Sequence, residues 1–102
     1  EVVIDKDKAS ALLARQLGAR LLILATDADG VYRDWGTERQ ELIRSTTPDE
    51  ISKMDFEPGS MGPKVEAACD FVMRTGERAV IGALTDIAEM VEGKAGTQFT
   101  IE

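Results

Sequence analysis

A glycine-rich turn that leads into an amphipathic helix is the stretch whose residues are best suited to chemistry. The turn reads Gly59-Ser60-Met61-Gly62-Pro63-Lys64. A helix start offers unpaired backbone N–H groups and the positive end of the helix dipole, so phosphate fits there. Pro63 suits the first helical turn, and Gly62 or Ser60 suits the N-cap. Because Lys64 opposes the dipole, the turn predicts an anion site, with an ordinary loop-to-helix junction and a solvated lysine as the alternative.

Two further polar loops lie next to apolar segments. They read Ile4-Asp5-Lys6-Asp7-Lys8 and Thr26-Asp27-Ala28-Asp29-Gly30-Val31-Tyr32. Ligands of parallel α/β sheets bind outside the carboxyl ends of the strands, so loops that leave strands are where a site is expected. The alternatives are a helix cap formed by Asp5 or Asp7 and a turn built on aspartate and glycine. A calcium-binding EF-hand is excluded, because Val31 and Tyr32 occupy the positions that need an acidic ligand and a glycine.

Hydrophobic periodicity predicts the elements that position these loops. Helices are expected over residues 7–18, 48–54 and 62–75, with a short helix marked by Ile87, Met90 and Val91. Strands are expected over residues 21–25, 79–84 and 98–101, and residues 31–33 are expected to pair with residues 41–44. Residues 1–5 fit the end of a strand or an extended loop. This order predicts an α/β fold in which helices are layered on a mainly parallel sheet.

The helix expected over residues 62–75 carries an apolar stripe. The stripe consists of Val65, Ala68, Cys69, Val72 and Met73. We expect Cys69 to belong to the core, because nothing near it in the sequence would activate it as a nucleophile. For Tyr32 and Trp35, packing within a loop and a platform for a nucleobase remain open alternatives.

The composition fits one soluble domain. The 102 residues are 43% apolar, and the net charge of −7 disfavours nucleic-acid or anionic-membrane binding. Apolar runs are too short to span a bilayer, and no signal segment opens the chain. One cysteine indicates a cytoplasmic setting, and the lack of histidine removes the commonest general base and metal ligand. The sequence also lacks the P-loop, dinucleotide-fold and protein-kinase motifs.

Four segments, taken in order, resemble the carboxyl-terminal part of carbamate kinases, in the amino-acid kinase superfamily. They are Val3-Ile4-Asp5-Lys6-Asp7, Leu24-Ala25-Thr26-Asp27-Ala28-Asp29-Gly30-Val31-Tyr32, Gly59-Ser60-Met61-Gly62-Pro63-Lys64-Val65 and Ile81-Gly82-Ala83-Leu84. The second segment is shared across the superfamily, whereas the first and third together are more specific to carbamate kinases. The resemblance covers almost the whole chain and implies the carboxyl-terminal part of an amino-acid kinase fold.

The resemblance implies phosphoryl transfer between ATP and carbamate, giving ADP and carbamoyl phosphate, with Mg²⁺. It implies that Lys6 and Lys64 contact the phosphates and the transferring group, and that Asp7 holds the two lysines in place. Thr26, Asp27 and Tyr32 would lie along the nucleotide. The remaining expected nucleotide-binding residues belong to the glycine turn and are Gly59, Ser60, Met61 and Gly62. No residue is assigned as a direct metal ligand.

The resemblance also implies that residues 1–102 form a single nucleotide-binding domain. Carbamate kinases carry a Gly-Gly-Asn loop and a further lysine in an amino-terminal half that has no counterpart here, so we expect an inactive fragment of a longer kinase. Cut sheet edges predict a homo-oligomer. Two alternatives stay open, namely a non-catalytic nucleotide-binding or assembly module and the lobe of a related amino-acid kinase with another acceptor.

Overall fold

The chain is built around a five-stranded sheet. The computed structural model describes residues 2–5, 18–34, 36–53 and 61–101. In spatial order the strands are β1 (Val2–Asp5), β2 (Leu21–Thr26), β6 (Arg78–Ala83), β7 (Thr97–Phe99) and β5 (Ser45–Thr46). Strands β1, β2 and β6 are parallel, whereas β7 runs antiparallel to β6 and β5 runs parallel to β7. The predicted α/β fold with a mainly parallel sheet is therefore confirmed.

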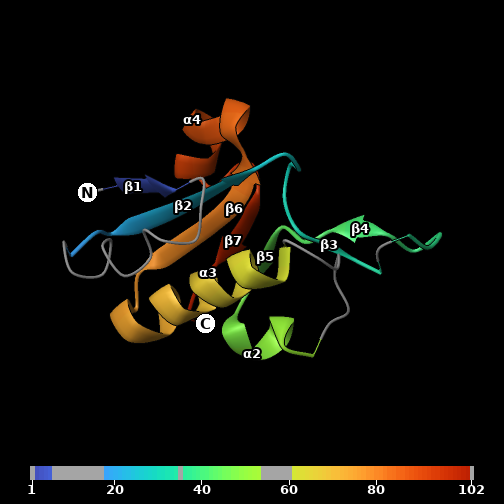
Figure 1. Cartoon of the computed structure of the whole chain (residues 1–102), viewed down its shortest axis with the longest axis horizontal. Coiled ribbons are helices and arrows are strands. Elements are labelled where there is room, and N and C mark those ends of the chain that lie inside the picture. Colours follow the sequence, from blue (N-terminus) through green and yellow to red (C-terminus); the bar gives the residue numbers. More distant parts are fainter. Residues whose placement is uncertain (1, 6–17, 35, 54–60, 102) are drawn as a thin grey trace.

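Helices cover both faces of this sheet. Figure 1 shows α3 (Met61–Thr75) on one face and α4 (Ile87–Val91) on the other. The short α2 (Pro48–Ile51) packs beside α3, and a 3₁₀ turn, η1 (Leu84–Asp86), leads from β6 into α4. None of the described helices is long and apolar enough to cross a bilayer.

The alternation of side chains along β2 explains why both faces are covered. Leu22 and Leu24 point into the larger core cluster, which contains Phe71 of α3, while Leu21 and Ile23 point into a smaller cluster with Met90 of α4. A strand whose two faces are both apolar is stable only between two layers. The continuous apolar run at residues 21–25 thus forms a buried parallel strand, as predicted.

The expected helix over residues 62–75 is present as α3, with one extra residue at its start. Gly62 lies inside this helix, so its predicted role as the N-cap is wrong. Met73 was expected on the buried stripe, but Met73 is 64% exposed, whereas Phe71 is buried. At 3.6 residues per turn the buried face of α3 is centred on Val65, Ala68 and Val72. Met73 lies outside this face on one side, whereas Phe71 lies within it on the other side.

The other sequence predictions are met with changes at the element ends. Residues 2–5 form strand β1, and the short helix α4 is present where expected. The expected strand over 98–101 is Thr97–Phe99, and the helix expected over 48–54 is confined to Pro48–Ile51. Residues 7–17 of the first expected helix lie outside the described residues. Strand β5 was not predicted.

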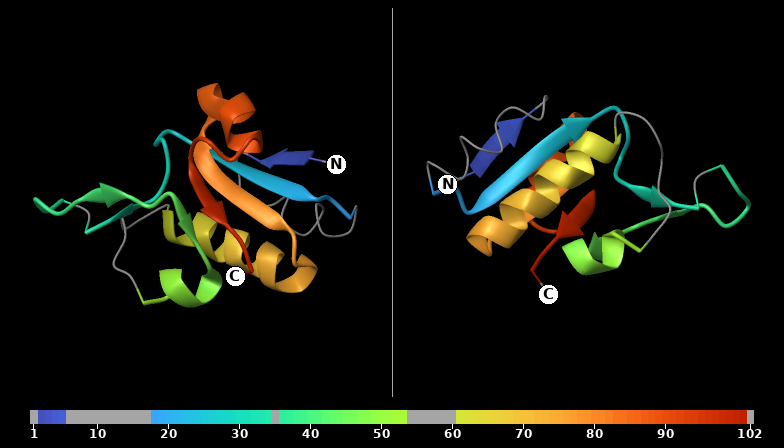
Figure 2. Two further views of the ribbon diagram at one scale, coloured as in Figure 1. Left: turned by 180° about the vertical axis from the view of Figure 1, so that it is seen from behind. Right: turned by 60° about the horizontal axis from the view of Figure 1, so that its bottom comes forward.

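The predicted small hairpin is also present. Strand β3 (Tyr32–Arg33) pairs antiparallel with β4 (Glu41–Leu42). Figure 1 and Figure 2 show this pair projecting from the side of the main sheet. An ion pair between Arg33 and Glu41 joins the two strands. A two-stranded ribbon is marginal alone, so its attachment to the body must hold it in place.

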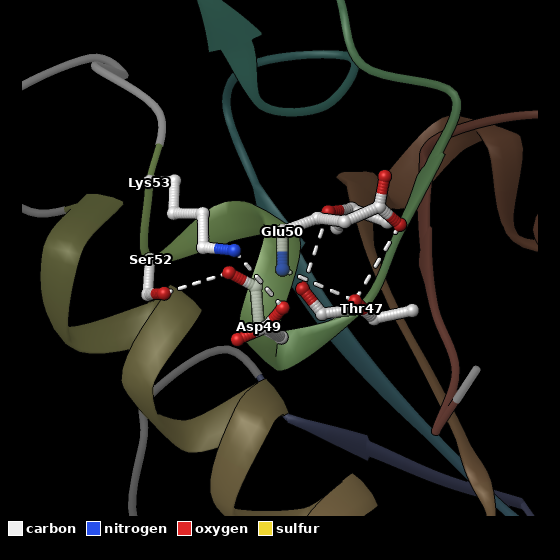
Figure 3. A network of polar contacts seen from close by, with 6 residues as sticks. Thr47, Asp49, Glu50, Ser52 and Lys53 are labelled. Atoms are coloured by element: carbon white, nitrogen blue, oxygen red, sulfur yellow. Dashed lines mark hydrogen bonds and ion pairs between the residues drawn. The ribbon is translucent and has the colours of Figure 1, made fainter.

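The start of α2 shows how local sequence sets an element. Thr47 is the N-cap, and its hydroxyl accepts a hydrogen bond from the backbone N–H of Glu50 at 3.1 Å. Figure 3 shows this network together with the ion pair between Asp49 and Lys53, whose atoms lie 3.3 Å apart. A threonine followed three residues later by glutamate is a capping pattern, and proline at the first helical position adds to it. The short helix thereby places Ile51 in the core.

Candidate functional site

Three parallel strands end at one edge of the sheet. Thr26, the last residue of β2, is paired in register with Ala83, the last residue of β6, and Asp5 ends β1 beside Leu24. Figure 1 shows that α3 runs in the opposite direction to β2 and β6, so its first residues lie on the side where these strands end. The structure therefore brings the loop after β2 and the start of α3 to one edge, where an α/β sheet binds its ligands. Lys6, Asp7, Gly59 and Ser60 of the predicted site lie outside the described residues.

The loop that leaves β2 alternates between solvent and core. Asp27 and Asp29 are exposed, Thr26 is half-buried, and Gly30 and Val31 are buried. Within the part of the chain that the structure describes, the Asp27 carboxylate has no recorded hydrogen bond or ion pair. The Asp27 side chain is thus exposed at the point where β2 ends.

Tyr32 is held by an aspartate in the same loop. Its hydroxyl donates to both carboxylate oxygens of Asp29, at 2.9 and 3.1 Å. This hydrogen bond, together with burial and the negative charge of Asp29, raises the pKa of the Tyr32 phenol above its ordinary value. The ring is thus kept neutral and oriented at the base of the hairpin.

Gly30 is required for space rather than for a left-handed turn. A Cβ atom at this position would lie 2.7 Å from Cδ1 of Leu42 and 2.9 Å from Oγ1 of Thr97. The hydroxyl of Thr97 also accepts a hydrogen bond from the backbone N–H of Val31 at 2.8 Å. Sequence reasoning did not identify Thr97, although a buried hydroxyl inside an apolar strand is a feature that could have drawn attention to it.

The first turn of α3 carries positive charge without a compensating acid. Lys64 is half-buried, no acidic residue occupies this turn, and no ion pair of Lys64 is recorded among the described residues. Gly62 and Pro63 beside it are half-buried, while Met61 packs its side chain into the core. A lysine at the positive end of a helix dipole favours an anionic ligand.

Cys69 fits a structural role. It is half-buried against the larger core cluster, and burial raises the pKa of its thiol. A raised pKa keeps the sulfur in the unreactive thiol form at neutral pH. The described residues contain no group of three or more side chains that could hold a metal ion.

These features define a layered α/β protein whose polar loops and helix start meet at the carboxyl edge of parallel strands. The sequence matches the profile of the Amino acid kinase family over residues 1–83. The chain therefore belongs to the amino acid kinase family.

Individual relatives are carbamate kinases. The chain is 53% identical to the carbamate kinase of Haemophilus influenzae over 98% of its own length and 57% identical to that of Rhizobium meliloti over 95%. It spans 32% and 30% of those two proteins, or about a third of their length. The solved carbamate kinase from Giardia lamblia bound to AMP-PNP superposes with a TM-score of 0.86 at 31% identity, covering 96% of this chain and 36% of that one.

Titration of Tyr32 tests the geometry of the loop. The chain has one tyrosine, so ultraviolet absorbance of the phenolate reports this side chain alone. We expect a midpoint above the ordinary value of 10.0, and Asp29→Ala should lower it because the neutral phenol loses its acceptor. The stabilisation from this pair is present below the unfolded pKa and is lost as pH rises through the folded one.

Asp27→Ala is the matched control, since it removes a carboxylate from the same loop without touching the phenol. Its titration midpoint should equal that of the wild type. Equal midpoints for Asp29→Ala and the wild type would contradict the pairing.

Proposed function

We propose that this chain is the ATP-binding lobe of a carbamate kinase-like phosphotransferase, which catalyses ATP + carbamate = ADP + carbamoyl phosphate. The observation that carries the proposal is identity above 50% to two carbamate kinases over almost the entire chain. The similar enzyme from Giardia lamblia binds AMP-PNP, a nucleotide of the ATP type, which supports ATP as the phosphoryl donor. We also propose a cytoplasmic setting, because the sequence has a single cysteine, which cannot form an internal disulfide.

In this proposal the phosphates lie against the first turn of α3. Lys64 would neutralise phosphate oxygens from the positive end of the helix, and the backbone N–H groups of Gly59, Ser60 and Gly62 would donate to the same phosphates. Met61 would contribute only through its backbone, because its side chain is in the core. Lys6 and Lys64, together with the loops that follow β1 and β2, would then enclose one nucleotide.

The remaining roles belong to the loops that follow β1 and β2. Lys6 would contact the transferring phosphoryl group, with Asp7 between the two lysines to reduce their mutual repulsion. Thr26, Asp27 and Tyr32 would lie along the nucleotide. The hydrogen bond between Tyr32 and Asp29 supports this placement, since it fixes the aromatic ring beside the loop that follows β2.

A site of this kind does not need histidine. Phosphoryl transfer relies on positioning and on electrostatic stabilisation of the transferring group, which lysines and backbone N–H groups supply. Mg²⁺ would enter with the nucleotide, because this ion is usually held by phosphates and one or two carboxylates. The exposed Asp27, which directly follows the last residue of β2, would be suited to such a contact.

Carbamate would bind to a part of the longer enzyme outside these residues, since this chain spans about a third of its relatives. We propose that residues 1–102 act as one nucleotide-binding domain. Carbamate is favoured as the acceptor over the acceptors of related kinases because the similarity to carbamate kinases is high. A coupled assay of the longer enzyme with each acceptor tests this choice.

The isolated chain should bind ADP or ATP weakly and release no ADP in a carbamate-dependent manner. The reason is that transition-state stabilisation requires donor and acceptor to be held together. Calorimetry measures binding, and a coupled assay measures ADP release. Sustained turnover by the 102 residues would contradict the proposal that carbamate binds elsewhere in the longer enzyme. A complete lack of nucleotide binding would contradict the proposal that this chain is the ATP-binding lobe.

Lys64→Ala should reduce the rate of the longer enzyme far more than the stability of the fold. Removing a cation from the first turn changes the free energy of unfolding by about half a kcal/mol or less. Deleting one preorganised donor at a developing charge typically lowers kcat by about 10² to 10³. In the isolated chain the same change should weaken ADP binding and leave adenosine binding unaltered.

Two further variants control the Lys64 experiment. Lys64→Arg should rescue only part of the rate, because a planar guanidinium does not reproduce a compact ammonium. Lys53→Ala removes an exposed lysine from another part of the surface and should leave kcat unchanged. Near-wild-type kcat in Lys64→Ala would show that the turn is structural only.

We also propose that copies of this chain associate. In the described part of the sheet β1 and β5 are the outer strands, and Ile4 of β1 is 47% exposed. Unpaired strand edges with apolar side chains favour pairing between chains. Sedimentation velocity at rising concentration should therefore show dimers or larger species.

Ile4→Lys should shift this association toward monomer, because a charge on an edge strand opposes pairing. Val91→Lys places the same charge at a similarly exposed apolar residue of α4 and serves as the control. A wild-type chain that stays monomeric at high concentration would count against the edge as an interface.

A further inference from the structure

The hydroxyl of Thr97 joins three segments that are remote in sequence. Thr97 is the first residue of β7 and is fully buried. Its oxygen accepts a hydrogen bond from the backbone N–H of Val31 at 2.8 Å, and its proton is donated to the backbone carbonyl of Ile43 at 2.6 Å. The backbone N–H of Ile43 in turn donates to the carbonyl of Val31 at 2.8 Å. Three buried residues thus form a closed set of hydrogen bonds.

This set lies directly beneath the loop that follows β2. Val31 is 0% exposed and lies between the two residues of the Asp29–Tyr32 hydrogen bond. Gly30 fits against Thr97 so closely that an added Cβ would lie 2.9 Å from the threonine hydroxyl. The backbone of the loop is therefore held against the side chain of one threonine.

We propose that Thr97 is the positioning residue for this loop and sets nucleotide affinity through it. The inference rests on the proposed nucleotide-binding function. Thr97 touches no ligand in this proposal. Its hydroxyl fixes the backbone at Val31, and that backbone fixes where Asp27 and Tyr32 meet the nucleotide.

The effect of removing the hydroxyl follows from the burial of its partners. Valine has nearly the shape of threonine, but Thr97→Val leaves one N–H and one C=O unpaired in the interior. The loop must then move to find water, because unpaired buried polar groups are costly. We expect ADP affinity to fall by about tenfold or more, which is within the cost of losing these two buried hydrogen bonds.

Two variants separate positioning from general stability. Thr97→Ser keeps the hydroxyl and should bind ADP within about twofold of wild type. Thr46→Val is the matched control, since Thr46 is also buried and lies on the neighbouring strand β5, and its hydroxyl donates to the backbone carbonyl of the adjacent Thr47 rather than to the loop after β2. This control should lower the thermal midpoint without changing ADP affinity. All affinities are measured by calorimetry at a temperature where each variant is folded.

Amide hydrogen exchange in the wild type supplies a readout that needs no variant. The N–H of Val31 should exchange more slowly than those of Ala28 and Asp29, which form no backbone hydrogen bond within the described part of the chain. In Thr97→Val the protection of Val31 should fall more than that of the β2 and β6 amides. Fast exchange at Val31 in the wild type would overturn the proposal even if Thr97→Val did not fold.

The binding experiments test whether Thr97 affects nucleotide affinity. Loss of both Val31 protection and ADP affinity in Thr97→Val, with neither change in Thr46→Val, supports the proposal. Loss of protection with unchanged ADP affinity overturns it while leaving nucleotide binding intact. A wild-type chain that protects Val31 but binds no ADP overturns the proposed function and, with it, the role of Thr97 in affinity.

Discussion

Parallel pairing of β2 with β6 in the middle of the sheet is the interaction on which the rest of the structure depends. Both strands are apolar on both faces, so neither is stable until a helix covers each side. The crossover through α3 covers one face, and α4 covers the other. Because parallel strands end together, the same pairing also gathers the loops after β2 and β6 at one edge. Core packing and the location of the site therefore share one cause.

Much of this arrangement can be predicted from local sequence. The apolar runs that become β2 and β6 are long enough to indicate buried strands, and helical periodicity locates α3 within one residue. Periodicity gives the direction of a buried face but not its width. For this reason Met73 was wrongly expected in the core, while Phe71, on the opposite margin, was missed. Strand β5 has only Ser45 and Thr46, which carry no apolar pattern, and its existence depends on pairing with the remote β7.

The candidate site divides in the same way. Polar loops after predicted strands could be found from sequence because the sheet topology determines where such loops meet. The contact of Thr97 with Val31 and Ile43 could not, because it joins segments whose association depends on the complete fold. Gly30 illustrates the difference. Its place in an Asp-x-Asp-Gly turn indicates backbone geometry, whereas the structure requires glycine there because Leu42 and Thr97 occupy the space of a side chain.

The short connection between α3 and β6 has a consequence for the order in which parts of the fold can open. Gly76 has a positive φ of 72° and ends the helix, so α3 and β6 are neighbours along the chain as well as in space. Their contact closes a short loop and loses little chain entropy. Strand β5 reaches β7 only across a long intervening segment and is held there by two residues. Local opening should therefore begin at β5 and α2, while α3, β6 and β2 stay together until the whole domain unfolds.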